Sequence, residues 1–125
     1  MVTDRSAEPA ASRSIEFVVR LGRALHQRGV PAHRLEQALQ EVAQALELEA
    51  QFYATPTALL SSFATEEAPL LHLDRLAVGA VSLGTMARLD ALAQRVVRRE
   101  VTTPEALREL EEITARTVSS PGWLT

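Results

Sequence analysis

The chain has 125 residues, which is enough for one domain with a single hydrophobic core and too few for two. It contains no cysteine, which excludes a disulfide framework, a thiolate metal site and a cysteine nucleophile. Its net charge of −3 argues against nucleic acid as the main partner, because binding to phosphates normally requires a basic surface.

Residues 1–13 mix small, charged and proline residues without any period, which is typical of a flexible tail. The charged residues of this segment also argue against a secretory signal. The sequence contains no apolar run of about eighteen residues, so no membrane span is predicted. We therefore expect a flexible tail at 1–13, a single domain at 14–118, and a C-terminal tail at 119–125.

The first half of the domain is predicted to begin with two helices. One covers residues 14–28, with Ser14 as its N-cap and Gly29 as its stop. Gly22 lies on its apolar face, which indicates either that another backbone packs closely there or that the helix tolerates a weak position. The second helix covers residues 31–47 and begins at a proline, and the short turn predicts an antiparallel hairpin.

The stretch 49–63 interrupts the helical period with aromatic and β-branched residues, which favour extended backbone. Pro56 has no N–H for a ladder, so Thr55-Pro56-Thr57 is predicted to be the turn between two strands, the second at 58–63. Residues 69–74 return as a third strand. The predicted fold class is α+β: a small antiparallel three-stranded sheet, with two helices before it and two after it (ααβββαα), and with helices on one face.

Two further helices follow the sheet. The first is predicted for residues 82–99, where apolar residues keep helical spacing. The second begins at Thr103-Pro104-Glu105, with threonine as N-cap and proline at the first position, and ends near Arg116. Three arginines close the earlier helix; they complement its dipole or attract an anionic membrane surface. These are Arg95, Arg98 and Arg99.

Few residues suggest chemistry. His33 and Glu36 lie three apart on one helix face, as metal ligands can, but a solvated helix face has the same pattern, and no metal or cofactor is predicted. A small hydrolase that uses His33 or His72 remains an alternative, although no nucleophile elbow or phosphate-binding loop occurs. Arg34 and Glu36 can form part of an interface or cap a strand end; a surface ion pair is the simpler interpretation.

In order and spacing, four segments resemble the N-terminal soluble domain of the threonine/serine exporter family. They are RLGRALHQRGVPAHRLEQALQEVAQALEL, AQFYATPTALLSSF, SLGTMARLDALAQRVVRREVTTPEALRELEEI and the ending PGWL. The resemblance covers about residues 14–124. It implies a non-catalytic gating or assembly module of an amino-acid exporter, at the cytoplasmic face of the cell membrane.

The resemblance also implies binding positions and a partner. The matching residues are Gly29, Arg34 and Glu36 in the helix hairpin, and Thr55, Pro56 and Thr57 in the sheet. The partner is a membrane-spanning exporter domain, either in the same chain beyond Trp123 or as a separate subunit. A homodimerisation module, in which an exposed strand edge pairs with its twin, is a further alternative.

Overall fold

In the computed structural model, residues 7–75 and 83–118 are described. They form four helices and three strands in the predicted order, which confirms the α+β class. The elements are α1 (Ala7–Gln27), α2 (Ala32–Ala45), β1 (Ala50–Thr55), β2 (Ala58–Phe63), β3 (Leu70–Arg75), α3 (Leu83–Val97) and α4 (Thr103–Val118). The division into tail, domain and C-terminal tail stays a prediction, and residues 1–6, Ser82 and 119–125 lie outside the described residues.

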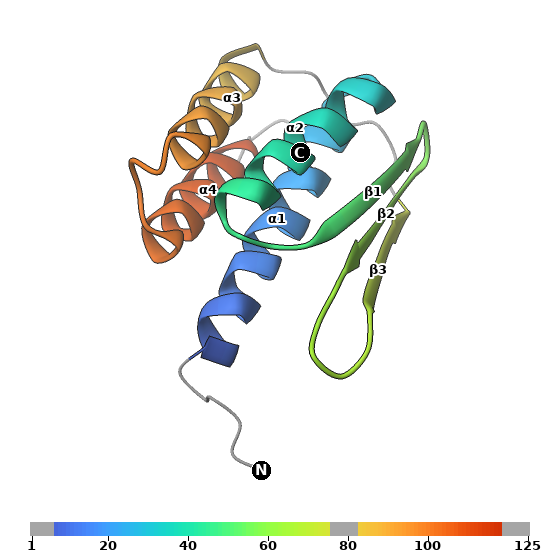
Figure 1. Ribbon diagram of the computed structural model, residues 1–125. Coiled ribbons are helices and arrows are strands. Elements are labelled where there is room, and N and C mark those ends of the chain that lie inside the picture. The colour runs from blue at the N-terminus through green and yellow to red at the C-terminus, as the bar shows by residue number, and fades with distance from the viewer. Residues whose placement is uncertain (1–6, 76–82, 119–125) are drawn as a thin grey trace.

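The sheet is antiparallel with the order β1-β2-β3, and all of its helices lie on one side. α1 and α2 pack directly on the sheet, and α3 and α4 pack on the other side of α1 and α2 (Figure 1). The protein therefore has three layers. Although the sheet is central in the sequence, it forms an outer layer in space, and one of its faces has no helix of the described chain against it.

The core lies between these layers. On the helix side of β2, Leu59 and Phe63 are almost fully buried, and they belong to one cluster with Phe17, Leu39 and Leu89. Burial of large apolar side chains from every layer supplies the main stabilising free energy of the fold. The chain packs closely at Gly22, but against leucine side chains and not against the predicted backbone: a Cβ atom there would lie 2.8 Å from Leu59 Cδ2 and 3.0 Å from Leu39 Cδ1.

α1 ends as predicted at Gly29, which has φ of +85°. The N–H of Gly29 donates to the carbonyl of His26, and the N–H of Val30 donates to that of Leu25. This pair of hydrogen bonds is the Schellman motif, in which a residue with positive φ closes the helix. Its start was predicted wrongly: α1 begins at Ala7, so Ser14 is a buried residue inside the helix and not its N-cap.

The start of α4 also differs from its prediction by one residue. The hydroxyl of Thr102 accepts the N–H of Glu105, and the Glu105 carboxylate accepts the N–H of Thr102. Thr102 is thus the N-cap of a capping box, and Thr103 already belongs to the helix. Hydrogen bonding with Thr102 lowers the pKa of the Glu105 carboxyl, and the bond from the Thr102 backbone N–H has the largest effect.

Candidate functional site

The predicted turn between β1 and β2 lies beside the turn between α1 and α2. A cavity of about 220 Å³ separates them, lined by His26, Gly29, Val30, Pro31, Ala32, Thr55 and Pro56. Three of the six sequence-predicted site residues, Gly29, Thr55 and Pro56, thus come together. We refer to this arrangement as the turn cluster. Its lining is mainly apolar, so it offers packing surface with few polar groups.

His26 links the two turns of the turn cluster. It lies near the end of α1, is 4% exposed, and its Nε2 donates a hydrogen bond to the carbonyl oxygen of Thr55 at 2.6 Å. A carbonyl oxygen can only accept, so Nε2 carries a proton. The other ring nitrogen, Nδ1, is buried, and no group of the described residues forms a hydrogen bond with it. His26 therefore holds the sheet turn against the helix hairpin.

Within the sheet turn, Thr55 organises the backbone through its hydroxyl. The N–H of Thr57 donates to Thr55 Oγ1 at 3.4 Å, and that hydroxyl donates to the carbonyl of Ala58 at 3.4 Å. Threonine side chains often stabilise turns in this way. Pro56 and Thr57 are exposed at the tip. The prediction that Thr55-Pro56-Thr57 joins the first two strands is confirmed by the pairing of Thr55 with Ala58.

Glu36 reaches from α2 to the outer edge of β1. Its Oε2 accepts the N–H of Ala54 at 2.7 Å, and one helical turn later Gln40 Nε2 donates to the carbonyl of Ala50 at 3.1 Å. Two side chains of α2 thereby satisfy backbone groups that an edge strand would otherwise present to solvent. Of the two roles predicted for Glu36, the structure shows the capping of a strand.

We expect Glu36→Ala to lower the free energy of unfolding by about 1 to 2 kcal/mol, because the Ala54 N–H loses a charged acceptor. Glu36→Gln keeps an acceptor oxygen at the same reach and is expected to lose about half as much. Urea denaturation followed by circular dichroism measures both. The matched control is Glu41→Ala on the exposed side of the same helix, where no change above about 0.5 kcal/mol is expected.

Arg34 and His33 do not line the cavity of the turn cluster. Both are exposed on the first turn of α2, and within the described residues neither forms an ion pair. No group of three or more potential metal ligands occurs within 7–75 and 83–118. Arg34 and Thr57 are thus the two predicted site residues for which the described structure shows no role in holding the two turns together.

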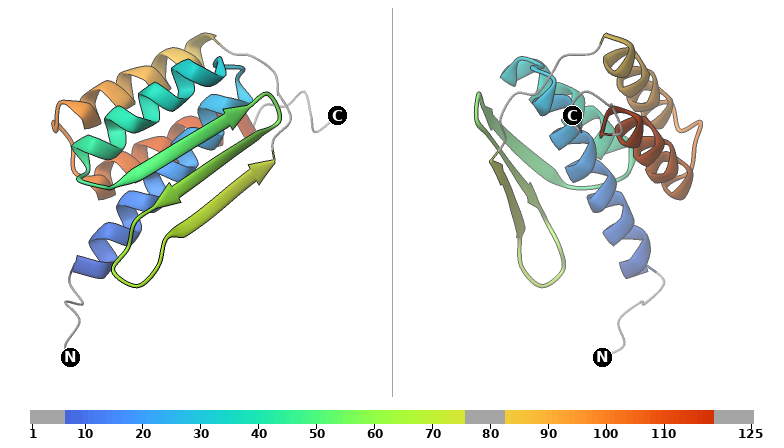
Figure 2. Two further views of the ribbon diagram at one scale, coloured as in Figure 1. Left: turned by 45° about the vertical axis from the view of Figure 1, so that its right-hand side comes forward. Right: turned by 180° about the vertical axis from the view of Figure 1, so that it is seen from behind.

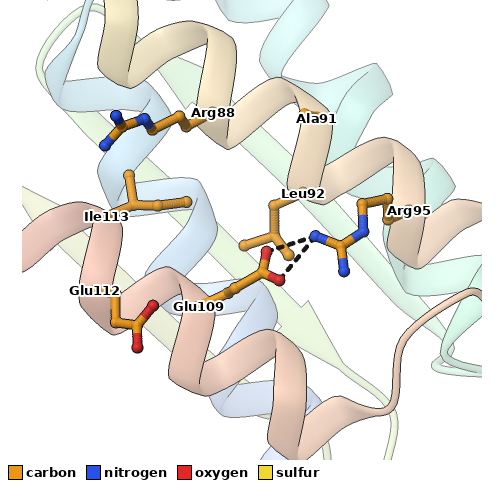
Figure 3. Close-up of a pocket in the computed structure, with 7 residues that line it drawn as sticks. All are labelled: Arg88, Ala91, Leu92, Arg95, Glu109, Glu112 and Ile113. Carbon is orange, nitrogen blue, oxygen red and sulfur yellow. Dashed lines mark hydrogen bonds and ion pairs between the residues drawn. The ribbon is translucent and has the colours of Figure 1, made fainter.

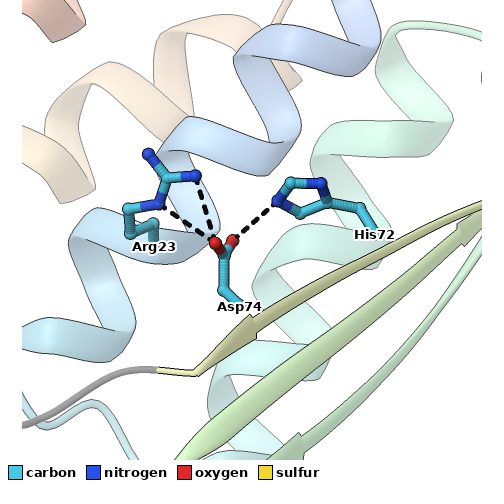
Figure 4. A network of polar contacts seen from close by, with 3 residues as sticks. All are labelled: Arg23, His72 and Asp74. Atoms are coloured by element: carbon cyan, nitrogen blue, oxygen red, sulfur yellow. Dashed lines mark hydrogen bonds and ion pairs between the residues drawn. The ribbon is translucent and has the colours of Figure 1, made fainter.

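A polar network joins α1 to β3 (Figure 4). Arg23 donates from Nε and Nη2 to Asp74 Oδ1 at 3.3 and 3.1 Å, and His72 Nε2 lies 3.1 Å from Asp74 Oδ2. Ser61 faces His72 on the neighbouring strand but is only 1% exposed. A hydrolytic nucleophile has to reach its substrate, so this histidine and carboxylate fit a structural network better than a catalytic one.

A second cavity of about 220 Å³ lies between α3 and α4 (Figure 3). Across it, Arg95 Nη1 donates to both carboxylate oxygens of Glu109 at 2.7 Å, which raises the pKa of Arg95. One arginine of the predicted basic cluster is thus neutralised by α4. Arg98 and Arg99 remain exposed, and Arg99 adopts φ of +60° in the turn that follows the helix.

Arg28 is a charged residue that sequence reasoning missed. It is 7% exposed, its Nη1 donates to the carbonyl of Ala24 at 2.8 Å, and its Nε is buried with no hydrogen-bond partner among residues 7–75 and 83–118. Burial lowers the pKa of this guanidinium. The signal available in the sequence was its position just before Gly29, where a cation complements the C-terminal end of a helix.

The face of the sheet opposite the helices is apolar. Tyr53, Leu60 and Leu73 face one another across the three strands in a single row, and Leu71 lies beside them on β3. All four are exposed, because alternation along each strand directs them away from the buried Ala54, Leu59 and Phe63. We call these four residues the outer apolar face.

Comparison with known proteins places these features in one family. A family model described as "Putative threonine/serine exporter" matches residues 16–125. Pheromone-regulated membrane protein 10 of Saccharomyces cerevisiae is 32% identical over 110 residues, which are 86% of this chain and 14% of that protein. The protein of the same name from Yarrowia lipolytica is also 32% identical, over 86% of this chain and 9% of its own length.

The chain thus spans about a tenth of the length of these curated relatives. No solved structure matches it. Among the helices that the structure describes, none is long and apolar enough to cross a membrane.

Proposed function

The chain belongs to the threonine/serine exporter family, and from this membership we propose that it forms a non-catalytic gating or assembly module of an exporter-like membrane transporter. The module lies at the cytoplasmic face of the membrane. Its partner is the membrane-spanning part of the exporter, either in the same polypeptide or as a separate subunit. The transported compounds are amino acids of the threonine and serine class, and the path that they follow is built by the partner.

The outer apolar face is the observation that carries this proposal. Tyr53 is 64% exposed, Leu60 38%, Leu71 65% and Leu73 58%, and these residues share one side of a three-stranded sheet. Isolated exposed apolar residues are common, but a contiguous set on one flat face indicates a surface that binds a partner. The named relatives are membrane proteins much longer than this chain, which supports a membrane-spanning part of the exporter as the proposed partner.

The turn cluster supports an architectural role for the family-matched residues. Gly29, Thr55 and Pro56 line a mainly apolar cavity, and Glu36 caps β1. We propose that these residues preserve the orientation of the sheet relative to α1 and α2, and thereby present the outer apolar face to the transporter. Within the described residues, the histidine nearest to a carboxylate, His72, shares that carboxylate with Arg23, which favours the module over a hydrolase.

The test is amino-acid export by the complete transporter that contains or binds this module. The double variant Tyr53→Lys/Leu60→Glu places opposite charges on directly facing positions, so the sheet keeps a favourable pair while the apolar face is lost. Export is expected to fall at least about tenfold, as judged from the loss of most of the apolar contact. Threonine efflux from preloaded cells or vesicles measures it.

The matched control is Leu83→Glu, which makes the same apolar-to-charged change at a position on α3 that is 82% exposed. Export should be retained in this variant. Undiminished export by the double variant, present at normal amounts, would contradict docking through the outer apolar face. Export that persists after removal of residues 14–118 would contradict the proposed function as a whole.

A further inference from the structure

The two edges of the sheet are treated differently by the rest of the chain. The β1 edge lies beside α2, whose Glu36 and Gln40 bind backbone groups of Ala54 and Ala50. β3 forms the opposite margin of the sheet (Figure 2). Among the described residues, no hydrogen bond reaches the outer backbone groups of β3. One edge is therefore capped and the other is open.

The backbone groups on the open edge follow from the ladder. The two-residue turn makes Thr55 and Ala58 a hydrogen-bonded pair. The hydrogen bond from the Ala64 N–H to the Glu49 carbonyl agrees with this, because in an antiparallel ladder every second pair along the two strands is hydrogen-bonded. Because hydrogen-bonded pairs alternate, Leu59, Ser61 and Phe63 bond to β3, and their partners are Asp74, His72 and Leu70. The remaining residues of β3 direct their N–H and C=O groups outward: Leu71, Leu73 and Arg75.

This edge lacks most of the features that keep edge strands apart. β3 is six residues long, and it contains three leucines but neither proline nor lysine. Proteins usually protect such an edge with prolines, lysines, bulges or charges directed inward, because an open strand is a template for another strand. The protective element present here is the inward pair of His72 and Asp74. An incoming strand therefore has to match a charge at this position.

A second copy of β3 provides that match. In an antiparallel pair related by a two-fold axis, the helix-side residues of one copy must lie opposite helix-side residues of the other copy. Since the helix-side residues of β3 have even numbers, the allowed registers pair even-numbered residues with even-numbered ones and odd-numbered with odd-numbered ones. One such register places Leu73 opposite Leu73 of the second copy. It also places each His72 opposite Asp74 of the other copy, and each Leu71 opposite Arg75 of the other copy.

The competing register is centred on His72. It places the two histidines opposite each other and each Asp74 opposite a leucine, Leu70 of the second copy. It also brings Arg75 opposite Pro69, which has no N–H to donate. The register centred on Leu73 uses all three outward residues in hydrogen-bonded pairs and places opposite charges together. Both backbone and side-chain complementarity therefore select it.

We propose that the chain forms a homodimer in which β3 pairs antiparallel with β3 of a second copy, with Leu73 at the two-fold axis. The three strands of each copy then form one continuous sheet with all helices on one side. Leu60 and Leu73 of both copies make an uninterrupted row across it, so the dimer extends the outer apolar face. This inference goes beyond the proposed function, because it concerns association of the chain with itself.

The absence of cysteine allows a direct test by crosslinking. In the proposed register, the two Cα atoms at position 73 lie about 5.5 Å apart, within the span of about 4.4 to 6.8 Å that a disulfide bridges. Leu73→Cys is therefore expected to form a disulfide-linked dimer under mild oxidation. Leu60→Cys is the matched control: it lies on the same face but one strand further in, roughly 14 Å from its counterpart in the second copy.

A second measurement uses the unlinked chain. Its mass from light scattering at high micromolar concentration is expected to be twice 13.7 kDa. Leu73→Lys brings two ammonium groups together at the axis and should weaken dimerisation by about tenfold or more. Tyr53→Lys, on the same face of the capped edge, should leave the dimer intact. Circular dichroism verifies that both variants are folded.

Three results would overturn the proposal. One is a monomeric wild-type chain in which Leu73→Cys crosslinks no faster than Leu60→Cys. Another is equally fast crosslinking at both positions in a dimer, which would mean that the copies stack through their faces. The third is a dimer that Leu73→Lys and Tyr53→Lys weaken equally. Because none of these measurements involves transport, their failure is distinguishable from failure of the proposed function.

Discussion

Leu59→Ala is expected to lower the free energy of unfolding by about 3 kcal/mol, as judged from deletions of buried leucine side chains in other proteins. Leu59 is 1% exposed, lies near the start of β2, the middle strand of the sheet, and packs against α1 at Gly22. The substitution leaves a cavity where the sheet meets the helices. Urea denaturation followed by circular dichroism gives the change, and Leu60→Ala on the exposed side of the same strand should cost about 1 kcal/mol or less.

Gly22→Ala provides a more specific test of the same contact. In the wild-type background the new methyl group would lie 2.8 Å from Leu59 Cδ2, and we expect a loss of about 1 kcal/mol despite the better helix propensity of alanine. In the Leu59→Ala background the contact with Leu59 Cδ2 is removed and Leu39 Cδ1, at 3.0 Å, stays close, so Gly22→Ala should cost clearly less than in the wild-type background. Strictly additive effects in this double-mutant cycle would contradict the packing described for α1 and β2.

His26→Leu is expected to destabilise the protein by about 2 kcal/mol. A leucine retains much of the buried apolar contact but leaves the Thr55 carbonyl without the donor that His26 Nε2 supplies. His26→Gln offers a side-chain N–H at similar reach, so it should restore about half of the loss. The free energy of unfolding from urea denaturation measures both variants.

His33→Leu is the matched control for His26, because His33 is an exposed histidine one helix later. It should change the free energy of unfolding by no more than about 0.5 kcal/mol. Equal losses for His26→Leu and His26→Gln would mean that the hydrogen bond to Thr55 contributes little, and that His26 acts in the turn cluster by packing alone.

Local features of the sequence predicted every helix and strand of the fold. Gly29 was identified as the stop of α1 because positive φ is easily reached only by glycine. Thr55-Pro56-Thr57 was identified as a turn because proline cannot contribute to the ladder. The two helix starts were placed wrongly, at Ser14 and Thr103, since several polar residues precede each helix and only their hydrogen bonds reveal which one is the cap.

The candidate site was predictable only in part. Gly29, Thr55 and Pro56 were selected through the family resemblance, and the structure brings them together. His26 and Arg28 were missed, because nothing in the spacing of a helix indicates which of its polar residues is buried under a distant turn. Glu36 was selected, but its acceptor role at Ala54 depends on how α2 lies against β1.

Element order and turn positions depend on contacts between residues close in sequence. They can be predicted from the sequence, because apolar residues repeat with a period of 3.6 in helices and 2 in strands. The position of the sheet as an outer layer, the capping of β1 by α2 and the open edge of β3 depend on residues far apart in sequence. Those contacts are selected by how the buried faces fit together, which only the folded chain settles. The two features proposed to bind partners, the outer apolar face and the edge of β3, are both of this second kind.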